Sequence, residues 1–433
     1  VATPGRPNTA EAVNLVAPPQ FDPPRGLYDG PFALTLTCDT PGAVIRYTTD
    51  GTAPTQSTGI AYTGPVTISR TSCLRAGAFR AGWTPSVVQT HSYLFLNQVL
   101  QQPRNPAGFP STWNGTVADY EMDPDVVNAP AYRNLARASL LTLPTLSIVT
   151  TTDNLFGTNG IYSNPWGEGT AWERPISAEW IDTDGTTGFQ VDAGFRVYGG
   201  AFRGFNLTRK KSFRILFKRQ YGSPKLDFDL FKGQDAATSF DMIVLRGGAN
   251  DGWNDWGRQS TQYIIDEYMR RTQLAMGHPS PHGTFVHLYL NGLYWGLYNV
   301  TERPVESFCA AYFGGEKEEW DALNRGEARG DSTTATWNAM LSQARSGLTD
   351  TASYQRIQGN NPDGTDNPAY DDLLDMDNYI GYMLCNFWGG TGDWPGHNYY
   401  AACRKPPNAT GFKFFNWDAE GAIVVWSSLN ANV

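Results

Sequence analysis

The chain has 433 residues, of which 40% are hydrophobic and 13% aromatic, so it is long enough for two or three domains with a sizeable buried core. Its formal net charge is −9. This charge argues against a nucleic acid as the main partner, because phosphate binding needs a clustered basic face. No apolar run approaches the roughly 18 residues that a membrane helix needs, and we expect no membrane span.

The cysteine pattern argues against structural zinc, because it contains no CxxC and no Cys/His spacing for a tetrahedral site. The cysteines are Cys38, Cys73, Cys309, Cys385 and Cys403. The Pro-, Gly- and Trp-rich composition, with many Thr/Asn-rich loops, is typical of a protein outside the cytoplasm. We expect a disulfide between Cys38 and Cys73, which lie on two predicted strands of a domain too small to be very stable alone.

Residues 1–25 are Pro-rich and lack periodicity, which predicts a linker. Residues 26–95 then alternate apolar and polar side chains in short runs, with a turn signal about every ten residues. This spacing predicts a small β-sandwich.

The run "IRYTTDGTAPT", followed by "YTGPVTIS", "CLRAGAF" and "HSYLF", resembles the immunoglobulin-like module at the C-terminus of chitobiases and hexosaminidases. The resemblance implies an accessory module, separable from the rest and without catalytic groups. Tyr47 or Trp83 could stack on a sugar, but packing within the domain is the commoner role of such aromatic side chains.

Residues 96–140 predict a connecting segment with one helix over 130–141, and residues 141–433 predict a second, larger domain. Helical spacing occurs over 261–277, 305–313 and 373–390. Residues 284–303 predict a hairpin with Asn291-Gly292 at its turn. Strands are expected over 144–150 and on both sides of a Gly-rich turn within 193–222.

The stretch "GDWPGHNYY", residues 392–400, holds Asp393, His397 and Asn398. Two aromatic runs around a Pro/Asn/Gly turn follow it and predict a hairpin that returns Asp418 to the neighbourhood of Asn398. Two carboxylates and an amide oxygen would suit Mg²⁺ or Mn²⁺. The alternative is turn capping, which Asp favours, and His397 is a candidate general base or a structural turn residue.

The order of elements matches that of a protein-kinase N-lobe: a Gly-rich turn, a strand lysine, a helix glutamate, a hairpin and a linker. The corresponding nucleotide-binding candidates are Lys210, Lys211, Glu267 and Glu302. Lys211 shares strand parity with apolar neighbours and could enter a cleft, whereas Lys210 would face the other way; both could also be solvated. The Asp393-x4-Asn398 spacing is that of the kinase catalytic loop.

The runs "KKSFRILFKRQYG", "VHLYLNGLYWGLYNVTER", "NYIGYMLCNFWGGTGDWPGHNYY" and "FKFFNWDAEG" resemble the spore-coat CotH family of secreted, atypical protein kinases over residues 143–425. The resemblance implies that Asp393 is catalytic, that Asn398 and Asp418 hold metal on ATP, and that Glu420 is a further metal ligand. It also implies a two-lobed α+β kinase-like fold. Such a fold predicts further helices beyond Val433, so we expect this domain to be incomplete at its C-terminal end.

Two classes of function follow from these patterns. The first is a secreted or surface kinase that uses ATP and Mg²⁺ or Mn²⁺ to phosphorylate protein Ser or Thr. The second is a non-catalytic extracellular protein for structure, adhesion or carbohydrate binding, built on a kinase-like scaffold. A pair of carboxylates would also suit glycoside hydrolysis, which the CotH resemblance does not support.

Overall fold

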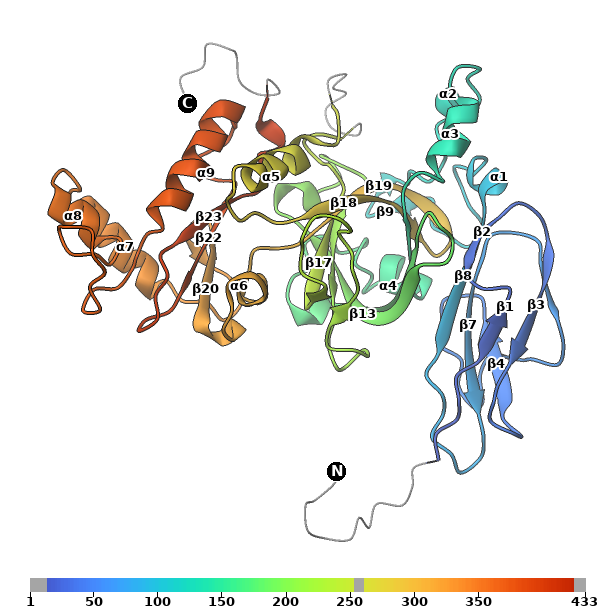
Figure 1. The fold of residues 1–433 in the computed structure, drawn as a ribbon. Coiled ribbons are helices and arrows are strands. Elements are labelled where there is room, and N and C mark those ends of the chain that lie inside the picture. Colours follow the sequence, from blue (N-terminus) through green and yellow to red (C-terminus); the bar gives the residue numbers. More distant parts are fainter. Residues whose placement is uncertain (1–13, 253–260, 424–433) are drawn as a thin grey trace, which may run out of the picture. The chain divides into compact units, whose positions relative to one another are not determined.

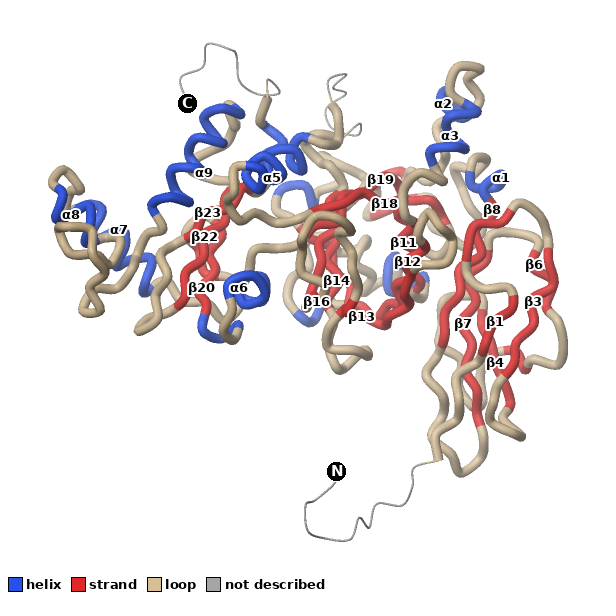
Figure 2. The backbone as a smooth tube through the Cα atoms, viewed as in Figure 1, coloured by secondary structure: helices blue, strands red, loops and turns tan. Residues whose placement is uncertain are grey.

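The computed structural model describes residues 14–252 and 261–423 (Figure 1). The chain forms two compact units, and strands are prominent in both (Figure 2). Unit 1 comprises Val1–Val197, Arg219–Ser223 and Phe285–Tyr298; unit 2 comprises Tyr198–Lys218, Pro224–Thr284 and Asn299–Val433.

Unit 1 begins with a sandwich of two sheets, with strand orders β1-β3-β6 and β2-β8-β7-β4-β5. Alternate residues of β7, among them Leu74, Ala76 and Ala78, pack into its core, because successive side chains of a strand point to opposite faces. The strands are β1 (Gln20–Asp22), β2 (Gly26–Tyr28), β3 (Phe32–Thr37), β4 (Val44–Thr48), β5 (Ile60–Ala61), β6 (Val66–Ile68), β7 (Ser72–Phe79) and β8 (Gln89–Phe95).

The sandwich takes in part of the segment expected to be a linker. Strand β1 lies within residues 1–25, and Val16 is fully buried in the sandwich core. A strand in Pro-rich sequence is easily missed when strands are predicted from sequence. Pro is nevertheless tolerated at the edge of a sheet, where it removes no ladder hydrogen bond. Residues 1–13 of the expected linker lie outside the described residues.

The expected Cys38–Cys73 disulfide is wrong for this structure, in which both residues are free thiols. Cys73 alternates with Leu74 on β7 and therefore faces away from the sandwich core, where its Sγ accepts a hydrogen bond from Ser92 Oγ at 3.4 Å. Cys38 packs against that core and donates to the carbonyl of Ala17 at 3.2 Å. Cys38 thus follows β3 of one sheet and packs toward the core, whereas Cys73 lies in the other sheet and points away from that core.

After the sandwich, unit 1 continues with a connecting segment and then strands β11, β12 and β13. Strand β12 pairs antiparallel with β11 and β13, and β11 pairs in parallel with β18. Trp113 of the connecting segment is buried against Tyr120, Tyr162 and Trp295. The elements are α1 (Leu96–Val99), β9 (Thr112–Trp113), β10 (Thr116–Val117), α2 (Pro124–Val127), α3 (Arg133–Ser139), β11 (Thr145–Val149), α4 (Thr152–Phe156), η1 (Thr170–Trp172), β12 (Arg174–Ile181) and β13 (Gly188–Tyr198).

A buried carboxylate joins the sandwich to β12. Glu179 is fully buried and accepts hydrogen bonds from Ser92 N at 3.1 Å and Ser92 Oγ at 2.5 Å. Arg25 Nη1 lies 3.5 Å from the same carboxylate, and Ser147 Oγ lies 2.8 Å from Ser92 Oγ. The sandwich is therefore bonded to the strands that follow it.

Unit 2 contains β14, β17, the end of β19 and a second sheet with the order β21-β20-β22-β23. The strands are β14 (Ser212–Leu216), β15 (Leu226–Asp227), β16 (Ser239–Phe240), β17 (Met242–Arg246), β18 (Gly283–Leu290), β19 (Leu293–Thr301), β20 (Trp320–Asn324), β21 (Glu327–Ala328), β22 (Tyr399–Arg404) and β23 (Lys413–Asn416).

Helices of unit 2 confirm the three helical segments expected from the sequence. They are α5 (Ile265–Ala275), α6 (Glu306–Phe313) and α9 (Met376–Gly389). The expected hairpin at Asn291-Gly292 is also present, with φ of 49° and 82° at its turn. Helices without a sequence expectation are η2 (Ala201–Arg203), η3 (Lys317–Glu319), α7 (Ala335–Arg345), α8 (Thr351–Arg356) and η4 (Ala419–Gly421).

Side-chain amides cover the outer edge of β23, where no further strand pairs within the described part of the sheet. Gln273 of α5 donates to Phe414 O at 2.7 Å and accepts from Asn416 N at 2.9 Å. Asn378 of α9 accepts from Phe414 N at 2.6 Å. Both helices lie beside β22 and β23 (Figure 1), so these amides satisfy backbone groups that an open edge would leave unpaired.

Within the described ranges, no helix is both long and apolar enough to cross a membrane. The apolar run 422–426, which the sequence predicts to need a covering layer, lies mostly outside the described residues.

We expect Glu179→Gln to remove part of the pH dependence of stability. Burial raises the pKa of Glu179 to about 7, well above the ordinary value of a glutamate, so the folded chain keeps a proton that the unfolded chain releases between these two values. The free energy of unfolding therefore falls as pH rises through this window, by on the order of 3 kcal/mol. Thermal unfolding at about pH 5 and about pH 8 compares wild type, Glu179→Gln and the exposed control Glu318→Gln. Identical pH dependence in all three chains would contradict the expectation.

We expect Gln273→Leu to destabilise unit 2 by about 2–4 kcal/mol, because it leaves buried backbone groups of β23 without partners. Gln343→Leu is the matched control, since the buried Nε2 atom of Gln343 has no hydrogen-bond partner. Removing that amide should cost little or should stabilise the fold. Chemical denaturation of the three chains measures the difference, and equal losses in both variants would exclude the edge-covering role of Gln273.

Candidate functional site

Arg246, the last residue of β17, lies at the centre of an acidic cluster in unit 2. Its Nη1 is 2.6 Å from Asp418 Oδ1, its Nη2 contacts Glu420 Oε1, and its Nε is 3.3 Å from Asp266 Oδ2. The residue is only 7% exposed, and its guanidinium lies over the ring of Trp417, 5.0 Å from the ring centre. One buried cation thus contacts three carboxylates from two segments far apart in the sequence.

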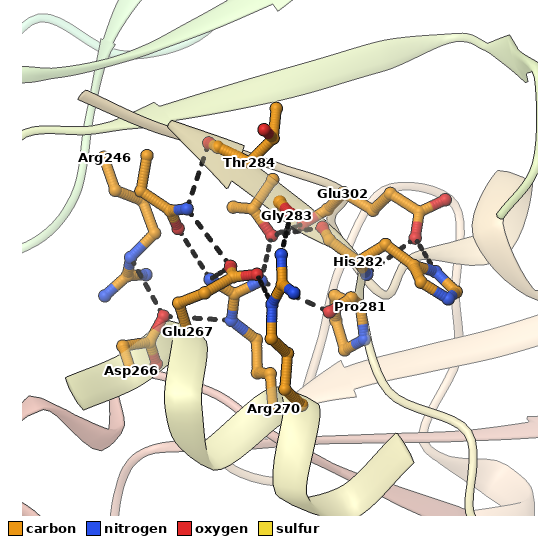
Figure 3. Close-up of polar contacts among 12 residues, drawn as sticks. Arg246, Asp266, Glu267, Arg270, Pro281, His282, Gly283, Thr284 and Glu302 are labelled. Carbon is orange, nitrogen blue, oxygen red and sulfur yellow. Dashed lines mark hydrogen bonds and ion pairs between the residues drawn. The ribbon is translucent and has the colours of Figure 1, made fainter. Parts of the chain in front are cut away.

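The first turns of α5 supply one side of this cluster (Figure 3). Asp266 contacts Arg246 and also Arg270, whose Nε lies 3.1 Å from Asp266 Oδ2. Glu267 accepts from Arg270, from Arg271 at 2.6 Å and from Asn299 at 3.1 Å. Spacing of three and four residues places these pairs on neighbouring turns of the helix.

The hairpin β22–β23 supplies the other side. Its register pairs Tyr399 with Asn416, which places Asn398 opposite Trp417 and next to Asp418. The two loops are joined by hydrogen bonds from Gly392 N to Gly421 O at 3.1 Å and from Ile423 N to Gly389 O at 2.7 Å. The hairpin therefore brings the segments of Asp393, Asn398 and Asp418 together, as predicted.

All three of these polar residues have a left-handed backbone, with φ of 60° at Asp393, 62° at Asn398 and 55° at Asp418. Asn and Asp adopt this conformation more readily than other side chains, but it still costs about 1–2 kcal/mol for an L-residue. Strained positions that gather at one mouth favour a functional role, because a fold tends to retain such strain at sites where it is used.

The two ends of the Asp393-x4-Asn398 loop differ in exposure. The Asp393 side chain is 66% exposed, and its Oδ1 lies 3.3 Å from His397 Nδ1, whose side chain is 50% exposed. Asp393 is thus open to a substrate, whereas the carboxylates around Arg246 lie deeper.

The acidic residues of the cluster differ in the direction in which their pKa is shifted. Burial raises the pKa of Glu420 to about 7, assisted by Asp418 and Asp266 and opposed by Arg246. Its buried Oε2 atom has no hydrogen-bond partner. Although burial favours neutral Asp266, the guanidinium groups of Arg246 and Arg270 hold the pKa of that carboxyl below its usual value. Glu420 therefore has one oxygen on Arg246 and a second, buried oxygen without a donor.

The predicted lysines lie just before β14 rather than within it. Lys211 is fully buried, and its Nζ donates to Thr208 O at 2.5 Å and Gly204 O at 3.0 Å and lies 3.9 Å from the centre of the Phe205 ring. Burial lowers the pKa of Lys211 to about 7. Lys211 therefore fixes the Gly-rich loop, while the partners of Glu267 are arginines and an amide.

Glu302 is buried at the end of the β18–β19 hairpin. Its Oε2 accepts from His282 N at 2.9 Å and lies 2.9 Å from His282 Nδ1 (Figure 3). Its Oε1 accepts from Tyr312 OH at 2.8 Å. These bonds tie the hairpin to α6.

The donor chemistry of the cluster fits a hard cation, which prefers carboxylate and amide oxygens. Glu420 Oε2 is a buried oxygen without a partner, and the Asp418 side chain is 45% exposed. Among residues 14–252 and 261–423, however, no group of three or more His, Cys, Asp or Glu side chains is arranged as metal ligands. Arg246 occupies one oxygen of each carboxylate instead.

Sequence reasoning missed Arg246, Asp266 and Arg270. A signal for Arg246 was present, because "MIVLR" is an apolar strand that ends in a cation, as does the kinase strand V-A-I-K. The run "IDEYMRR" likewise shows the acid-to-arginine spacing of helix ion pairs.

A strand cation paired to a helix carboxylate, an Asp-x4-Asn loop and a hairpin that ends in Asp are the parts of a protein-kinase site. Comparison with protein families agrees. The model of the CotH kinase protein matches residues 196–432, more than half of the chain, and the chain belongs to that family. The chitobiase/beta-hexosaminidase C-terminal domain matches residues 23–90, within the sandwich segment. Comparison with curated protein sequences found no match.

We expect Lys211→Met to loosen the Gly-rich loop, because the carbonyls of Gly204 and Thr208 lose their ammonium donor. Amide hydrogen exchange of residues 202–208 should become faster by about tenfold or more. Lys210→Met is the matched control and should leave exchange in this loop unchanged. Equal exchange in wild type and Lys211→Met would show that the ammonium does not hold the loop.

Proposed function

We propose that the chain is an atypical protein kinase that transfers the γ-phosphate of ATP to protein Ser or Thr with Mg²⁺ or Mn²⁺. The observation that carries the proposal is the meeting of Asp418 with the Asp393–Asn398 loop at the mouth of the β22–β23 hairpin, inside the family match.

Asp393 would orient the acceptor hydroxyl and take up its proton. The acceptor oxygen forms a bond to the γ-phosphorus while the bond from that phosphorus to the β–γ bridging oxygen breaks, and ADP leaves with the electron pair. A divalent ion bound at this site neutralises phosphate charge. Asp418, Asn398 and Glu420 are the residues that would hold it, and the unpartnered Oε2 of Glu420 supports their inclusion.

In this proposal, the other residues predicted to bind the cofactor hold the elements around the site in place. Lys211 shapes the Gly-rich loop over the phosphates, and Lys210 is its neighbour on that loop. Glu267 orders α5 through Arg270 and Arg271, and Glu302 orders the connection after β19. Arg246 and Asp266 supply the ion pair between a strand and α5.

We also propose the rest of the domain organisation expected from the sequence: a sandwich that here begins before residue 26 and takes in β1, a connection over 96–140 and a kinase-like α+β domain over 141–433. Family membership supports the last of these. Composition and family favour an extracellular or surface protein that acts on a protein partner rather than on nucleic acid. Tyr47 and Trp83 are partly buried against the sandwich core, so carbohydrate binding by the sandwich rests on the family match alone.

A non-catalytic structural or adhesion protein is the second candidate. It is favoured by one observation, the contact of Arg246 with Asp266, Asp418 and Glu420, which gives the described cluster a protein cation where a metal would otherwise bind.

Two substitutions test the kinase proposal. We expect Asp418→Asn to abolish metal-dependent nucleotide binding and phosphoryl transfer together, because the metal loses a charged ligand. Asp393→Asn should abolish transfer but change nucleotide affinity by less than about threefold, since positioning and charge neutralisation are separate contributions. Calorimetric titration of ATP with Mn²⁺ and a transfer assay measure the two effects, with circular dichroism as the folding control. Wild type that binds no nucleotide with either metal would favour the non-catalytic candidate.

A further inference from the structure

We propose that Arg246 is a positioning residue that holds Asp418 and Glu420 in the arrangement in which they bind a divalent cation. This inference rests on the proposed function, because it concerns the metal side of the same site. It assigns Arg246 a role that acts through the carboxylates it contacts.

The contacts of Arg246 leave one oxygen of each ligand available. Nη1 is directed to Oδ1 of Asp418 and Nη2 to Oε1 of Glu420. The second oxygen of Glu420 is buried without a partner, and Asp418 keeps an exposed edge. A cation can therefore bind the remaining oxygens while the guanidinium retains the others, as outer-shell hydrogen bonds do for ligating carboxylates.

The planar guanidinium suits this role, because its donors are fixed in a fork that can face two carboxylates at once. Nε of Arg246 is directed to Asp266, and the ring of Trp417 lies 5.0 Å from its Cζ. The arginine is thus held on three sides, and its own orientation is determined by packing.

The same contacts connect α5 to the 418–420 loop. Asp266 accepts a hydrogen bond from Ala419 N at 2.9 Å with Oδ1, while its Oδ2 faces Arg246 and Arg270. A single helix carboxylate therefore fixes both the arginine and the backbone between the two ligands. Loss of Arg246 would leave Asp418, Glu420 and Asp266 without the cation that holds these like charges together.

Binding of Mn²⁺ alone tests the proposal. The electron paramagnetic resonance signal of free Mn²⁺ measures this binding, at equal concentrations of folded chain. We expect Arg246→Met to weaken Mn²⁺ binding by about 10- to 100-fold without changing the number of sites per folded chain. Arg246→Lys should lose less, because it keeps the charge but not the fork. Arg404→Met is the matched control, since Arg404 pairs with Glu319 in the same unit and is not among the partners of Asp418 or Glu420.

The outcomes separate this proposal from the proposed function. Wild type that binds no Mn²⁺ alone overturns this proposal, while the kinase proposal still depends on the titration of ATP with Mn²⁺, because substrate phosphates supply part of the coordination of such ions. Wild type that binds Mn²⁺, with Arg246→Met binding equally or more tightly, overturns only the role of Arg246, and tighter binding would identify the guanidinium as a competitor of the cation. If Arg246→Met does not fold, Arg246→Lys decides. Mn²⁺ binding that is weaker than in wild type but still detectable supports the role of Arg246, and an affinity equal to that of wild type overturns it.

Discussion

The contact of Arg246 with Asp266, Asp418 and Glu420 is the interaction on which the site depends. Three carboxylates in a buried cluster repel one another, and each loses hydration that it had in the unfolded chain. A guanidinium at the end of β17 offsets both effects and brings a strand, a helix and a loop to a common point. Without this cation, the side chains of Asp418 and Glu420 would be repelled by Asp266 of α5.

The surrounding structure keeps that point in place. Gln273 and Asn378 bind the free edge of β23, so the strand that leads to Asp418 is held by α5 and α9 as well as by β22. Asp266 begins the same helix that carries Gln273, and the two residues contact successive parts of the segment 414–419. Helix α5 thus sets both the path of the strand and the charge at its end.

Local patterns in the sequence predicted much of this fold. Periodicity gave α5, α6 and α9, and the Asn291-Gly292 pair gave a hairpin, because these signals depend on neighbours in the chain. The approach of Asp418 to Asn398 could be predicted because the two strands of a hairpin run antiparallel from a common turn, so residues at similar distances from that turn lie opposite each other. The disulfide was wrong because strand parity decides which face a thiol takes. Arg246 was missed because its partners lie about 20 and 170 residues away, and no local pattern reports such pairing.

Two buried glutamates show how a structural acid differs from one suited to ligand binding. Burial raises the pKa of both Glu179 and Glu420 to about 7, and each faces an arginine. Both oxygens of Glu179 accept hydrogen bonds from Ser92, so its environment is complete and joins the sandwich to β12. Glu420 has one oxygen on Arg246 and one without a partner. A buried acceptor without a donor costs about 1–3 kcal/mol, which a bound cation would offset. Similar pKa shifts therefore carry different meanings, and hydrogen-bond satisfaction distinguishes the two acids.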